Sequence, residues 1–107
     1  MAQVNTVTDL GFTSTGRDLY HLKVTGLDLT SGVGTVSLPT DQIQAIIPTS
    51  SSVENTDDYV LSHNFTVSGN VLTITVKKMQ VSAPNTWGEA ATADVLGSVY
   101  DVLIVGL

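Results

Sequence analysis

The stretch YVLSHNFTVSGNVLTITVKKMQV, residues 59–81, decides the expected fold. Apolar residues recur at every second position in two runs, which are separated by the polar sequence Ser68-Gly69-Asn70. Alternation with a period of two places one set of side chains on a buried face and the other toward water. Two such runs joined by a three-residue turn that carries glycine predict a β-hairpin.

The segment before this hairpin contains shorter runs of the same kind. Residues 18–25 predict a strand in which Tyr20, Leu22 and Val24 face inward. Residues 34–38 predict a short strand that ends at Pro39, because proline has no N–H for a strand ladder.

Residues 41–47 fit either one helical turn or a strand, and we favour the strand. Pro48 is expected to end this segment in either case. Residues 98–105 predict an apolar strand in which both faces are apolar apart from Asp101. Such a strand is expected to be central in a sheet or covered on both sides, including by a partner subunit.

These segments together predict an all-β fold of about six to eight short strands, an antiparallel β-sandwich or a small barrel. Residues 17–107 are expected to form a single β domain, since the chain of 107 residues is too short for two cores. Residues 1–16 predict either an N-terminal arm or an edge strand. An arm with spaced apolar residues could add a strand to a neighbouring sheet.

The charge composition of the chain limits the kinds of partner that we expect it to bind. Only 13% of the residues are charged, against about 25% in an ordinary soluble domain. This low charge favours a protein that is secreted or packed among copies of itself. The net charge of −6 argues against nucleic-acid binding, which needs clustered basic residues. Lys77-Lys78 is the only basic pair, and we interpret it as an edge-strand charge that prevents wrong pairing.

The sequence predicts no enzyme, no cofactor and no metal site. The chain has no cysteine, and it shows neither a nucleophile–base pattern nor closely spaced metal ligands. His63 falls on the apolar face of the hairpin, where a hydrogen-bonded structural histidine is the favoured interpretation. A metal site that joins His21, His63 and an aspartate is the less favoured alternative. The adjacent pair Asp57-Asp58 is interpreted as solvated loop charge.

Residues 82–97 interrupt the alternation and contain Trp87, the residue with the clearest binding potential. Its side chain could cap the open end of the core, contact another subunit or stack on a sugar ring. Residues 89–94 are expected to form one helical turn at most. A carbohydrate- or cell-surface-binding module would use Trp87 with Tyr59 or Tyr100 as stacking residues.

The first residues lack a basic region followed by an apolar core, and no apolar run approaches the roughly 20 residues needed to span a bilayer. We therefore expect neither a signal peptide nor a membrane partner, and synthesis in the cytoplasm.

Three segments of the C-terminal third stand out together. They are the strand VLTITV at 71–76, the sequence NTWGE at 85–89 and the final segment VYDVLIVGL at 99–107. In these segments the chain resembles small structural proteins of tailed bacteriophages. The resemblance implies a virion component, above all a capsid decoration protein bound to the major capsid protein, with a tail or neck component as the alternative. It also implies a homo-oligomer, with a trimer as the first expectation.

Eight residues are expected to contact partners. They are Val4, Val7, Leu10, Phe12, Trp87, Tyr100, Val102 and Ile104.

Overall fold

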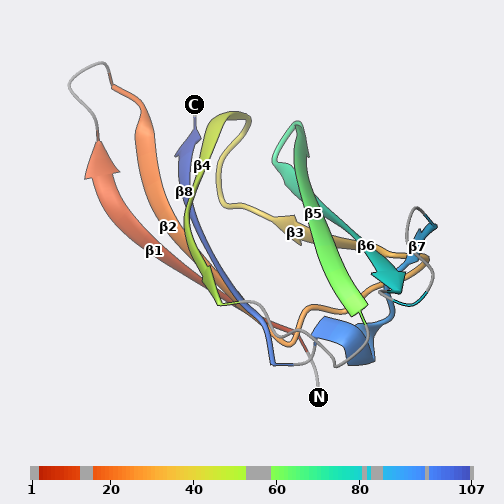
Figure 1. Ribbon diagram of the computed structural model, residues 1–107. Coiled ribbons are helices and arrows are strands. Elements are labelled where there is room, and N and C mark those ends of the chain that lie inside the picture. Colours follow the sequence, from red (N-terminus) through yellow and green to blue (C-terminus); the bar gives the residue numbers. More distant parts are fainter. Residues whose placement is uncertain are drawn as a thin grey trace.

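The computed structural model describes residues 3–12, 16–52, 59–80, 82, 86–95 and 97–106. Their strands form two antiparallel sheets that face each other as a small sandwich (Figure 1), which confirms the predicted all-β class. The first sheet has the order β1 (Val4–Phe12), β2 (Asp18–Thr25), β8 (Val99–Gly106) and β4 (Ile43–Ser52). The second has the order β3 (Val33–Ser37), β6 (Val71–Gln80) and β5 (Tyr59–Ser68), and β7 (Trp87–Glu89) also pairs with β6.

The predicted hairpin is the β5–β6 pair. Its register runs without a shift from Tyr59 opposite Gln80 to Ser68 opposite Val71. The turn therefore contains two residues, Gly69 and Asn70, and is one residue shorter than predicted. Gly69 has a φ of 57°, a left-handed conformation that glycine adopts without the steric cost of a Cβ atom.

The core lies between the two sheets. The first sheet contributes inward-facing side chains from β2 and β8, and the second contributes them from β3 and β6. Each set occupies alternate positions, as the sequence predicted for β2 and for the hairpin. The residues on these four strands that are buried in the core are Tyr20, Leu22, Val24, Val36, Leu72, Ile74, Val76, Tyr100, Val102 and Ile104.

The final strand occupies the centre of the first sheet. β8 pairs with β2 on one side and with β4 on the other, as expected for a strand with two apolar faces. Residues 1–16 contain an edge strand, because β1 pairs with β2 and has no second neighbour among the described residues. In Figure 1 the β1–β2 hairpin extends beyond the rest of the sandwich.

Two expectations about the strands were wrong. Pro48 does not end β4, which continues to Ser52. β4 is the edge of its sheet, where a residue without an N–H costs no ladder bond, and the register shifts between Pro48 and Ser50. Lys77 and Lys78 do not lie on an edge either, because β7 pairs with β6 at these positions.

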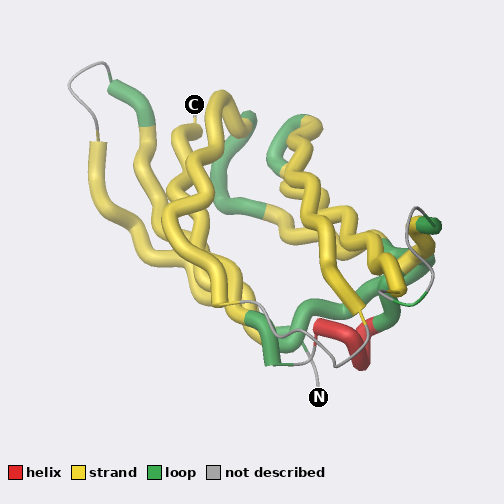
Figure 2. The backbone as a smooth tube through the Cα atoms, viewed as in Figure 1, coloured by secondary structure: helices red, strands yellow, loops and turns green. Residues whose placement is uncertain are grey.

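The segment after the hairpin is more regular than predicted. Residues 87–89 form β7, and Thr92–Val95 form a single 3₁₀ turn, η1. The expectation of one helical turn at most is thus confirmed, but the short strand was not predicted. Figure 2 shows η1 at one end of the sandwich, beside chain segments that cross between the two sheets. No helix in the described part of the chain has the length and apolar character needed to cross a membrane.

Two valines in the hairpin test this account of the core. Val76 on β6 is fully buried, whereas Val60 on β5 is 44% exposed. We expect Val76→Ala to lower the free energy of unfolding by roughly 1.5–3 kcal/mol, the burial energy of a valine side chain. Val60→Ala should change it by less than about 0.5 kcal/mol. Urea denaturation followed by circular dichroism measures both, and equal effects would contradict the assigned faces.

Candidate interaction surfaces

A histidine–tyrosine pair links the two sheets. His63 on β5 and Tyr100 on β8 form a hydrogen bond of 2.8 Å between Nε2 and the phenol oxygen. Their ring centroids lie 5.1 Å apart, and Phe65 packs edge-on against Tyr100 at 6.4 Å. Burial lowers the pKa of His63 below its ordinary value of 6.5 and raises the pKa of Tyr100. The predicted structural role of His63 is confirmed by this hydrogen bond.

His21 lies elsewhere, on the face of the first sheet that points away from the core. Its Nε2 is 3.1 Å from an Asp101 carboxylate oxygen, and both side chains are partly exposed. His21 and His63 therefore do not converge on one site. Among the described residues no group of three histidine, cysteine or acidic side chains could hold a metal ion. The pair Asp57-Asp58 lies outside the described residues.

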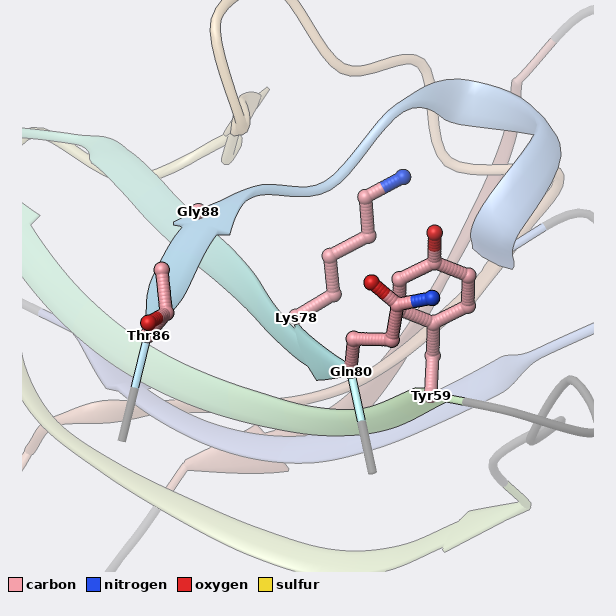
Figure 3. Close-up of a pocket in the computed structure, with 5 residues that line it drawn as sticks. All are labelled: Tyr59, Lys78, Gln80, Thr86 and Gly88. Carbon is pink, nitrogen blue, oxygen red and sulfur yellow. The ribbon is translucent and has the colours of Figure 1, made fainter. Parts of the chain in front are cut away.

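A shallow pocket lies at the end of the second sheet near β7 (Figure 3). It is lined by Tyr59, Lys78, Gln80, Thr86 and Gly88. The Lys78 ammonium group lies 4.7 Å from the centroid of the Tyr59 ring. One face of that ring is thus already in contact with a cation of the same chain.

The same lysine is held by the loop that follows β7. Lys78 Nζ lies 3.0 Å from an Asp94 carboxylate oxygen, which also accepts a 2.8 Å hydrogen bond from the Ala91 amide. The Ala91 hydrogen bond is the main reason that the pKa of Asp94 is lowered, and Lys78 adds to the effect. These contacts, which we call the clasp, hold η1 against β6. We therefore interpret the pocket residues as structural.

Trp87 does not lie in this pocket. Its register places it opposite Met79, whereas Gly88, opposite Lys78, faces the pocket. Successive residues of a strand point to opposite faces, so Trp87 projects from the outer face of the second sheet. It is 46% exposed and does not cap the core. The stacking residues expected for carbohydrate binding are not brought together, because Tyr59 lies on the other face and Tyr100 is buried.

The outer face of the first sheet carries apolar side chains in adjacent rows. In one row Leu19, Val105 and Ala45 are neighbours, and in the next Leu103 lies beside Ile47. We call these five residues the outer patch. All five are at least partly exposed, and Ile47 is 52% exposed. The His21–Asp101 pair borders the outer patch.

The outer face of the second sheet has a different composition. Thr66, Thr73 and Thr35 form one row across β5, β6 and β3, and Asn64 lies beside Thr75 in the next. These polar rows are typical of an antiparallel sheet that meets water. At the β7 end of the same face, Val60, Met79 and Trp87 form an apolar row.

The predicted contact residues divide into three groups. Val4 and Leu10 on β1 and Trp87 on β7 are exposed, with exposed fractions of 54%, 50% and 46%. Val7 is half-buried and packs against the core. Phe12 is the last residue of β1, and its side chain lies outside the described residues.

The three predicted contacts on β8 are core residues. Tyr100, Val102 and Ile104 are fully buried between the sheets and are not available to a partner. The intervening positions, Leu103 and Val105, lie in the outer patch. The sequence showed that β8 has two apolar faces but did not show which one faces the second sheet. The burial pattern of β8 supplies that information, and its pairing with β4 brings Ile47 beside Leu103 on the opposite face.

Comparisons with protein families, with curated proteins and with solved structures found no match to this chain.

The His63–Tyr100 pair predicts a loss of stability in mild acid. The folded chain holds His63 with a lowered pKa, whereas in the unfolded chain the group titrates near 6.5. Below about pH 6.5 the unfolded chain therefore binds more protons than the folded chain. The free energy of unfolding consequently decreases as the pH is lowered. We expect the urea midpoint to decrease between pH 8 and pH 5.

His63→Gln should remove this part of the pH dependence, while His21→Gln should leave it in place. Urea denaturation of the three proteins at pH 8, 7, 6 and 5 separates the two histidines. A His63→Gln protein with the same pH profile as the original chain would contradict the assignment.

Proposed function

We propose that this chain is a non-enzymatic structural protein of a tailed-bacteriophage virion, in particular a decoration protein that binds the capsid shell. A tail or neck component is the alternative location. The observation that carries the proposal is the outer patch on β2, β8 and β4. It places apolar side chains next to one another on a sheet face that points away from the core.

The outer patch supports a docking role on physical grounds. A solvent-facing sheet surface is normally polar, and contiguous exposed apolar residues mark interaction sites. The outer patch has apolar side chains at its centre and the His21–Asp101 pair at its border. An apolar centre with a polar border is typical of a protein–protein interface.

The low charge of the chain and the clasp between Lys78 and Asp94 are both consistent with a docking role for the outer patch. With 13% charged residues, the chain has few groups whose desolvation would oppose close packing among other proteins. The pocket beside β7 is lined by Lys78, whose ammonium group is already paired with Asp94. The outer patch is therefore a better candidate for the working surface than this pocket.

Particles made with and without the gene test the proposal. We expect mass spectrometry of purified particles to find the chain in many copies. Particles from a strain that lacks the gene should assemble but release their DNA at a lower temperature, and added protein should restore the original release temperature. Particles that contain none of this chain would contradict the proposed function.

A matched pair of variants tests the outer patch in the same assay. Ile47→Glu places a charge within the outer patch, so we expect at least a tenfold weaker binding to the depleted particles, about 1.4 kcal/mol. Thr35→Glu places the same charge in the polar part of the outer face of the second sheet and should bind normally. Co-sedimentation of each variant with the particles gives the bound fraction. Equal binding would show that the outer patch is not the docking surface.

A further inference from the structure

β5 presents an open sheet edge. It is ten residues long, its register with β6 has no shift, and no described residue pairs with its outer side. The strand contains no proline and no acidic, lysine or arginine side chain. Natural proteins commonly block long edges with such residues, with bulges or with very short strands.

The other edge strands of the described chain each carry one of these features, and β7, which pairs only with β6, is three residues long. β4 has Pro48 and two register shifts, and β1 has a register shift between Asp9 and Gly11. β3 is five residues long, and the Thr35 carbonyl on it accepts a hydrogen bond from the Gln3 side chain. β5 is therefore the edge on which a further strand can be added with the least hindrance.

The inward side chains of β5 are also incompletely covered. Leu61 and Phe65 are only partly buried, and Val67 is 40% exposed. Leu72, directly opposite Val67 on the neighbouring strand, is fully buried. The inward apolar side chains are thus fully buried on β6 but only partly buried on β5, one strand further out. A strand added to β5 would cover these side chains and extend the second sheet.

We infer that the added strand is β5 of a second copy, paired antiparallel about a twofold axis. The inference specifies the self-association within the proposed structural role, and it uses a surface separate from the outer patch. The chain carries a net charge of −6, so most contacts between copies bring acidic groups together. β5 brings none, because its ten residues contain no acidic side chain.

The alternation of β5 restricts the register of this pair. Residues directly opposite each other in an antiparallel pair point to the same face, so the inner residues must face inner residues. Two registers that satisfy this rule keep almost the whole strand paired. One places His63 opposite itself, and the other places Asn64 opposite itself.

The register centred on Asn64 fits the side chains better. Two His63 rings opposite each other would compete for the space beside Tyr100, to which each is hydrogen-bonded. Asn64 lies on the exposed face, where two amides can each donate and accept one hydrogen bond. The same register places Leu61 opposite Val67 of the second copy, so apolar side chains cover one another. The twofold contact closes at two copies, so it forms a dimer and not the trimer that the resemblance implied.

The mass of the purified chain gives the first test. We expect light scattering on a sizing column to give a dimer that dissociates on dilution. Asn64→Lys places two like charges opposite each other and should raise the dissociation constant at least tenfold. Thr35→Lys makes the same charge change on the same face of the second sheet and should leave the dimer intact. A chain that is monomeric at all concentrations, or a dimer unaffected by Asn64→Lys, would overturn the inference.

A disulfide gives the second test, since the chain has no cysteine of its own. Asn64→Cys should form a cross-linked dimer under mild oxidation, because directly opposed Cβ atoms lie within reach of a disulfide. Thr35→Cys should not. An Asn64→Cys protein that fails to cross-link would overturn the Asn64-centred pairing.

Ile47→Glu separates this inference from the proposed function. The variant should remain a dimer while it loses particle binding. A dimer through β5 that is absent from particles would refute the virion role alone, and a monomer that still binds particles would refute the β5 pairing alone.

Discussion

The arrangement of β8 between β2 and β4 is the constraint on which the first sheet depends. β8 supplies Tyr100, Val102 and Ile104 to the core, and it hydrogen-bonds to a neighbour on each side. Because alternate residues point outward, the apolar residues at the other positions of β8 must appear on the outer face. The outer patch is therefore a direct consequence of a central strand with two apolar faces in a sandwich that covers only one of them.

The sandwich offers contacts in two different directions. The outer patch lies on a sheet face, where association depends on side-chain packing. The free side of β5 is a sheet edge, where association depends on backbone hydrogen bonds and adds only a strip of side chains. A protein that binds a surface through one and a second copy through the other can do both at once. Tyr100 connects the two regions, since it belongs to β8 and bonds His63 on β5.

The local sequence pattern predicted the strands well, but it predicted poorly which strands lie side by side. Alternation identified the β5–β6 hairpin, the inward face of β2 and the inward position of His63, because each depends on residues close in sequence. Strand order depends on contacts between distant segments, so the sequence did not show that β8 lies beside β4 or that Leu103 meets Ile47. The same gap explains the wrong expectations at Pro48 and Tyr100. Pro48 is tolerated because its strand is an edge, and Tyr100 is unavailable because its side chain faces the second sheet.

The pairing of β2 with β8 also has a consequence for the rate of folding. These neighbours are separated by about 80 residues of chain, since Lys23 opposes Asp101 and Thr25 opposes Val99. A contact of such long range requires closure of a large loop before it returns any stabilisation, so topologies of this kind fold in milliseconds to seconds. The β5–β6 hairpin, whose strands are joined by two residues, can form within microseconds. The second sheet can then form early and act as the template on which the first sheet assembles. Until β8 pairs with β2, one side of β2 has no neighbouring strand.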